Sequence, residues 1–86
     1  MKLYLFSTPS CKPCANLKSY LDSNNIEYTV KDAIQDMELS MQFKIRSTPT
    51  LILLNNQDEV ISSAVGFTTP EQKDKVNVII SLFNKS

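Results

Sequence analysis

The sequence contains no histidine and no tryptophan, and it has one glycine among its 86 residues. Without histidine the chain cannot build a Ser-His-Asp triad, an imidazole acid–base pair or a histidine-ligated metal site. The single glycine, Gly66, excludes the glycine-rich loops that cradle phosphates, because those loops need several glycines. Nine basic and nine acidic residues give a formal net charge of zero, so nothing in the charge points to nucleic acid or an anionic membrane.

Long apolar segments are also missing. No uninterrupted apolar run is longer than Leu51–Leu54, far short of the ~20 residues that span a bilayer. The apolar stretch within residues 1–6 is too short for a secretory signal, because it ends at the polar Ser7. We therefore expect a cytoplasmic protein in which residues 1–86 form one globular domain. The lack of an extended apolar surface segment favours a monomer.

The order of apolar runs and turn residues predicts an α/β protein. A βαβ unit, a second helix, a hairpin and a closing helix give the order β-α-β-α-β-β-α and a four-stranded mixed sheet with helices on both faces. The predicted elements are a strand at 2–6, a helix at 11–22 with Ser10 as its N-cap, a strand at 27–30, a helix at 33–43, strands at 50–54 and 59–65, and a helix at 70–83.

Two of the predicted helices begin with capping signals. Residues 69–72 place threonine at the N-cap, proline at the first helical position and glutamine at the third. Asp32 and Gln35 have the spacing of a second capping box. The helical spacing that predicts the 33–43 helix is that of Ile34, Met37, Met41 and Ile45.

The two cysteines, Cys11 and Cys14, lie three positions apart where a predicted strand leads into a helix. Such a pair can be half of a zinc site, a structural disulfide or a redox dithiol. Zinc needs four ligands, and this chain offers two thiols and no imidazole. A disulfide that closes so short a loop adds little stability and would not stay oxidised in the cytosol. A redox dithiol is therefore the favoured interpretation.

Their positions in the helix predict different roles for the two thiols. As the first helical residue, Cys11 would lie among free backbone N–H groups at the positive end of the helix dipole, which stabilise a thiolate. Cys14, one turn further in, should be more buried and protonated. We expect Cys11 to attack a substrate disulfide and Cys14 to resolve the mixed disulfide. Lys12 either tunes the thiol pKa or is a solvated surface residue, and Pro13 pre-organises the first turn.

The chain resembles the thioredoxin/glutaredoxin family over nearly its whole length, and three separated segments carry the resemblance. Residues 10–14 look like the active-site turn of the family, with Pro13 placed as in thioredoxins. Residues 44–51 look like the segment that carries its cis-proline, and residues 65–67 resemble the glycine turn that completes the substrate groove. The resemblance implies a thioredoxin fold, with thioredoxin-like motifs on a chain of glutaredoxin size.

The resemblance also implies a substrate groove formed by Thr48, Pro49, Gly66 and Phe67. A cis Pro49 would bring the Thr48 backbone beside Cys11, where it can pair with an extended substrate segment. The residues alone allow other interpretations. Pro49 could be a trans proline that starts a strand, Gly66 a turn with positive φ, and Phe67 a core aromatic.

The chain departs from the family pattern at three positions. Ser10 replaces the tryptophan that thioredoxins usually carry before the first cysteine. Leu5 stands where thioredoxins place a buried acid that relays the proton of the resolving thiol, so deprotonation of Cys14 would rely on water or on the leaving thiolate. Gly66 is the one glycine left of the pair with which glutaredoxins hold glutathione.

We therefore predict a cytoplasmic dithiol–disulfide oxidoreductase that reduces protein disulfides through the Cys11–Cys14 pair and binds no metal or organic cofactor. The resemblance implies disulfide-containing clients such as ribonucleotide reductase, with electrons from a thioredoxin-reductase-type donor or from glutathione. Three alternatives stay open. One is a glutaredoxin that uses glutathione through Cys11 alone, and another is a non-catalytic module that binds a partner in the groove. The third is a redox sensor, with slow turnover and a partner affinity that differs between the oxidised and reduced states.

Overall fold

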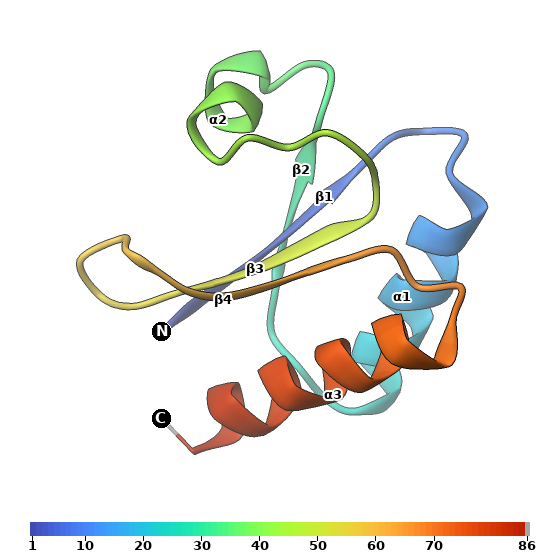
Figure 1. Cartoon of the computed structure of the whole chain (residues 1–86), viewed down its shortest axis with the longest axis vertical. Coiled ribbons are helices and arrows are strands. Elements are labelled where there is room, and N and C mark those ends of the chain that lie inside the picture. The colour runs from blue at the N-terminus through green and yellow to red at the C-terminus, as the bar shows by residue number, and fades with distance from the viewer. Residues whose placement is uncertain (86) are drawn as a thin grey trace.

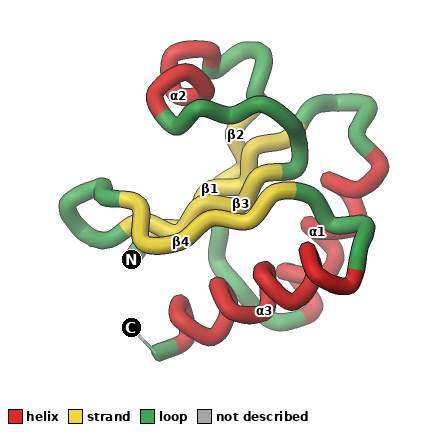
Figure 2. Tube along the Cα trace, viewed as in Figure 1, coloured by secondary structure: helices red, strands yellow, loops and turns green. Residues whose placement is uncertain are grey.

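The computed structural model describes residues 1–85 and shows a four-stranded mixed sheet with helices on both faces (Figures 1 and 2). This architecture and the predicted order of elements are confirmed. In chain order the elements are β1 (Lys2–Ser7), α1 (Lys12–Ser23), β2 (Thr29–Asp32), α2 (Met37–Gln42), β3 (Thr50–Leu54), β4 (Val60–Val65) and α3 (Pro70–Asn84).

The strands lie in the order β2-β1-β3-β4. β1 and β2 are parallel, as the right-handed βαβ unit requires, and the other neighbours are antiparallel. Since parallel strands end at the same edge, the loop before α1 and the turn after β2 leave the sheet side by side (Figure 1). The last pair in their register is Ser7 with Asp32.

Successive side chains of a strand point to opposite faces of the sheet, so that each face has its own hydrophobic core. On one face, α1 and α3 pack over the odd-numbered residues of β1, and on the other α2 lies alone (Figure 1). Leu3 and Leu5 belong to the first core and Phe6 to the second. Every residue of β3 is buried, as expected for a strand covered on both sides.

The closing helix begins as its capping signal predicts. The Thr69 side chain accepts a hydrogen bond from the Gln72 backbone N–H, and the Gln72 side chain bonds back to the Thr69 backbone. Val76, Ile79 and Ile80 are buried against the sheet.

The predicted helix over 33–43 is wrong in its extent, because α2 begins at Met37. Residues 33–36 form turns, in which Asp32 Oδ1 accepts hydrogen bonds from the backbone N–H groups of Ile34 and Gln35 at 2.8 and 3.1 Å. The aspartate therefore folds a turn instead of capping a helix. Three of the apolar residues at helical spacing face solvent, with exposed fractions of 63, 61 and 73% for Ile34, Met37 and Met41.

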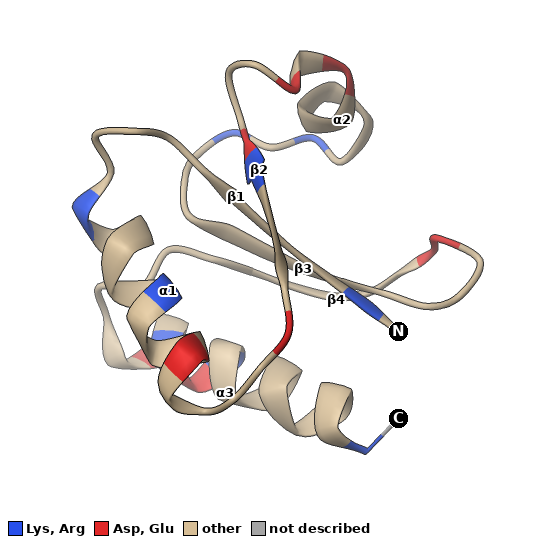
Figure 3. Cartoon of the chain, turned by 180° about the vertical axis from the view of Figure 1, so that it is seen from behind, with Lys and Arg blue, Asp and Glu red and all other residues tan. Residues whose placement is uncertain are grey.

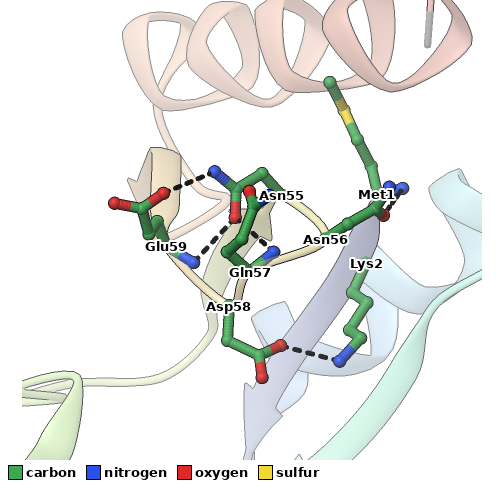
Figure 4. Close-up of polar contacts among 7 residues, drawn as sticks. All are labelled: Met1, Lys2, Asn55, Asn56, Gln57, Asp58 and Glu59. Carbon is green, nitrogen blue, oxygen red and sulfur yellow. Dashed lines mark hydrogen bonds and ion pairs between the residues drawn. The ribbon is translucent and has the colours of Figure 1, made fainter.

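The hairpin between β3 and β4 is held by its own side chains (Figure 4). Asn55 Oδ1 accepts hydrogen bonds from the backbone N–H groups of Gln57 and Glu59, at 2.9 and 3.0 Å. The Lys2 ammonium donates to Asp58 at 2.7 Å, which ties the hairpin to the start of β1. Elsewhere, basic and acidic positions are interspersed, with both signs on α1 (Figure 3).

Candidate redox site

The two cysteines lie between the end of β1 and the first turn of α1, and they form a disulfide with their Cα atoms 5.2 Å apart. The prediction that Ser10 caps this helix is wrong. Cys11 is the N-cap, because its backbone is extended and its Sγ accepts the hydrogen bond of the Cys14 backbone N–H at 3.2 Å. A sulfur at this position takes the place of a capping hydroxyl.

The surroundings of the two sulfurs differ. Cys14 is 1% exposed and continues the buried stripe of α1 that includes Leu17 and Leu21. Cys11 is half-buried and lies at the helix start, where a backbone N–H group already points at its sulfur. Such a donor, together with the positive end of the helix, favours the thiolate form of Cys11 when the disulfide is reduced.

The two residues between the cysteines occupy the first turn. Lys12 is exposed to solvent. Pro13 follows it at a position whose backbone N–H has no partner within a helix, so the proline costs no hydrogen bond there.

Thr48 lies close to the cysteine loop. The Cys11 backbone N–H donates to the Thr8 carbonyl at 3.3 Å, and the Thr8 hydroxyl lies 3.3 Å from the Thr48 hydroxyl. Thr8 therefore links the cysteine loop to a segment 40 residues away in the chain. The sequence offers no signal for this contact, because hydroxyl residues in loops are common and their partners are distant.

The Thr48–Pro49 peptide bond is cis, and Pro49 is buried. Its carbonyl accepts a hydrogen bond from the Gly66 backbone N–H at 2.7 Å. Gly66 has a φ of +83°, and a Cβ there would lie 2.5 Å from the Gln72 Nε2 atom. The positive φ therefore favours glycine at this turn, and an added Cβ would also displace the Gln72 side chain from its capping position.

Phe67 belongs to the core instead of the surface. Its side chain is 8% exposed and packs among the residues under α1 and α3. The centroid of the Phe67 ring lies 5.3 Å from that of the Tyr20 ring and 5.6 Å from the Lys73 ammonium. Of the four residues that the resemblance places in a groove, Pro49 and Gly66 are joined by a backbone hydrogen bond and Thr48 contacts Thr8 of the cysteine loop. Phe67 instead fills the core.

A cavity of about 280 Å³ flanks the disulfide. Both cysteines line it, together with Ser7, Lys18 and Asp32. The part of the chain that the structure describes holds no cluster of three or more His, Cys, Asp or Glu side chains suited to a metal ion. None of the helices between Met1 and Lys85 is both long and apolar enough to cross a bilayer.

Comparison with known proteins gives consistent matches. The model of the Glutaredoxin family matches residues 3–56. The SPbeta prophage-derived thioredoxin-like protein YosR of Bacillus subtilis is 33% identical over 76 residues, which cover 88% of this chain and 94% of that protein. The Gene 56 protein of Mycobacterium phage D29 is 25% identical over 84 residues, covering 95% of this chain and 86% of the phage protein.

Solved structures of thioredoxins have the same fold as this chain. A poplar thioredoxin h, PtTrxh4, superposes with a TM-score of 0.68 at 25% identity, over 91% of this chain and 74% of its own. The cysteine pair at the start of α1 and these relatives identify a thiol–disulfide oxidoreductase with a thioredoxin fold. The chain belongs to the glutaredoxin family.

Proposed function

We propose that the protein reduces disulfide bonds of client proteins in the cytoplasm, with Cys11 as the attacking thiolate and Cys14 as the resolving thiol. The observation that carries this proposal is the difference between the two sulfurs. A half-buried Cys11 that accepts a backbone hydrogen bond can reach a substrate, whereas Cys14, at 1% exposure, can reach only its neighbour.

The exchange has two steps. The Cys11 thiolate attacks one sulfur of the client disulfide, and the other client sulfur leaves as a thiolate that takes up a proton. Cys14 then loses its proton and attacks Cys11, which forms the internal disulfide and releases the second client thiol. The client gains two electrons and two protons, and the cysteine pair is oxidised.

The segment around Thr48 offers a place for the client chain. Among the hydrogen bonds of residues 1–85, none uses the backbone N–H or carbonyl of Thr48. An extended client segment can pair with these free groups, as peptides do when they add to a sheet edge. The Thr8 hydroxyl holds Thr48 beside the cysteine loop, so such pairing would bring the client disulfide to Cys11.

The test is to trap the intermediate. With Cys14→Ser, the mixed disulfide between Cys11 and a client protein such as insulin should accumulate. With Cys11→Ser, no mixed disulfide should form and reduction of insulin should be abolished. Mass spectrometry of the trapped adduct identifies the attacking sulfur. If Cys11→Ser retains reduction of insulin, the proposed roles are wrong.

The match to the Glutaredoxin family favours one further candidate, reduction through glutathione. In that case Cys11 alone suffices, and Cys14→Ser should retain activity on glutathionylated substrates. The reduction potential of the cysteine pair separates the electron donors. A value of about −270 mV indicates a dedicated reductase as the electron donor, and one of about −200 to −230 mV indicates glutathione.

A further inference from the structure

The route by which Cys14 loses its proton is the least obvious part of the exchange. Cys14 is almost fully buried, and Leu5, on the strand beneath α1, is fully buried and cannot accept a proton. The thiol must nevertheless ionise before it attacks Cys11. An acceptor must therefore reach Cys14 from another direction.

The neighbouring strand brings an acid to this place. Asp32, the last residue of β2, is the cross-strand partner of Ser7, so both side chains point to the same face of the sheet. That face is the one that carries Leu3 and Leu5 and packs against α1. Lys31, one residue earlier, points to the opposite face, where its ammonium lies 5.3 Å from the Tyr4 ring centroid.

The cavity of about 280 Å³ connects this acid to the buried thiol. Cys11 and Cys14 line it at one side, and the charged side chains on its wall are Asp32 from β2 and Lys18 from α1. Its uncharged lining includes Ser7 and Thr8. At about 30 Å³ for each water molecule, the volume has room for several, enough to carry a proton between groups that do not touch.

Asp32 is held in a fixed orientation. Within residues 1–85 its carboxylate accepts hydrogen bonds from the backbone N–H groups of Ile34 and Gln35, both through Oδ1. The second carboxylate oxygen, Oδ2, has no partner among the described residues. One oxygen thus holds the turn after β2, and the other is free to accept a proton on a residue that lines the cavity.

We infer that Asp32 accepts the proton of Cys14 through the cavity when Cys14 attacks Cys11. The inference rests on the proposed two-step exchange. The Cys14 S–H bond breaks, its proton passes through water to Asp32, and the resulting thiolate forms the S–S bond to Cys11 while the client thiolate leaves. Asp32 then returns the proton to solvent or to the departing thiolate, so the carboxylate is regenerated.

The reaction of the reduced protein with 5,5′-dithiobis(2-nitrobenzoate) reports the two steps separately. Attack by Cys11 releases one thionitrobenzoate, and attack by Cys14 on the resulting mixed disulfide releases the second. Stopped-flow absorbance resolves the two phases. The key variant is Asp32→Asn, which keeps the Oδ1 acceptor for Ile34 and Gln35 and removes the proton acceptor. Asp36→Asn is the matched control, because Asp36 makes no side-chain capping bond and does not line the cavity.

We expect Asp32→Asn to slow the second phase at pH 7 by at least about tenfold, since a positioned base commonly contributes about 10²-fold or more. The first phase should be unchanged, and Asp36→Asn should match the unsubstituted protein in both. The second phase of Asp32→Asn should also rise about tenfold per pH unit, as for deprotonation by hydroxide, whereas a purely structural role would leave the pH profile unaltered.

A second phase slowed by less than tenfold, or an equal slowing of both phases, would overturn the role of Asp32. Failure of the proposed function looks different. The unsubstituted protein would then release one thionitrobenzoate per molecule and no second phase.

Discussion

On one face of the sheet, α1 and α3 bury a continuous set of leucine, isoleucine and valine side chains, whereas on the other face α2 covers a much smaller core. Cys14 lies on the well-packed face, in the buried stripe of α1. The short helix α2 contributes the partly buried Leu39 and leaves Met37 and Met41 exposed. The comparison suggests that α1 and α3 supply most of the stability and fix the resolving thiol in place.

The largest expected difference between the two faces concerns their apolar side chains. Leu17 is fully buried in α1, one turn after Cys14, so Leu17→Ala should lower the free energy of unfolding by about 2–5 kcal/mol. Met41→Ala on α2 removes a side chain that is 73% exposed and should change it by less than about 0.5 kcal/mol. Urea denaturation measures both. Equal losses would show that α2 is packed against something in solution and would break the comparison.

The turns that lead into and out of these helices give the next largest effect. Gly66 precedes α3 with a φ of +83°, and an added Cβ would meet Gln72, so Gly66→Ala should cost about 1–3 kcal/mol. Lys44 follows α2 with a φ of +55° and closes a Schellman motif in which Ile45 N–H bonds to the Ser40 carbonyl at 2.8 Å.

Glycine is the usual residue at the position of Lys44, so Lys44→Gly should leave stability unchanged or raise it by up to about 1 kcal/mol. Thermal unfolding compares the two variants directly. A loss of stability in Lys44→Gly would mean that the lysine side chain, and not its backbone conformation, holds the end of α2.

The loss of stability on removing a helix N-cap should also differ between the two faces, but by a smaller amount. Thr69 caps α3 through a hydrogen bond to the Gln72 backbone N–H, and Thr69→Ala should cost about 0.5–2 kcal/mol. Asp36 stands at the corresponding position of α2 without a side-chain capping bond, so Asp36→Ala should cost less than Thr69→Ala. Urea midpoints with an unchanged m value would establish both. The reverse order would mean that α2 depends on its N-terminus more than α3 does.

The same contrast explains which elements could be predicted from sequence. β3 was predicted with its observed bounds, because a strand that is apolar on both faces has one interpretation once the residues around it form turns. The start of α3 was predicted from its capping box. In both cases the local signal and the buried core agree.

Where the local signal was ambiguous, the prediction failed. Asp32 followed by Gln35 has the spacing of a capping box, yet the same aspartate can fold a turn with the N–H groups that follow it. Ser10 is a better capping residue than cysteine, but the chain turns into the helix one residue later, at Cys11. The second strand is also observed two residues later than predicted, at Thr29–Asp32.

Part of the candidate site could be predicted from local sequence signals, and part could not. The spacing of Cys11 and Cys14 was a sufficient signal for the redox pair. The Thr8–Thr48 contact and the position of Asp32 on the cavity depend on strand register and on segments distant in sequence, which composition and spacing do not contain. Phe67 shows the same limit, since only the structure distinguishes a core aromatic from a groove residue.

The smallest expected effect is a pH dependence on the well-packed face. Tyr28 packs against that core, and burial, followed by its hydrogen bond to Asp22 at 3.0 Å, raises its pKa above 10.0. The folded state therefore holds the phenol proton more tightly than the unfolded chain does. The resulting stability is fully present below about pH 10 and is lost as the pH rises through the raised pKa. Tyr28→Phe should remove this contribution and flatten the stability profile between about pH 9 and 11, measured by urea unfolding at each pH. An unchanged slope in Tyr28→Phe would assign the alkaline loss of stability to other groups and would leave the hydroxyl of Tyr28 without a part in holding β2 to α1.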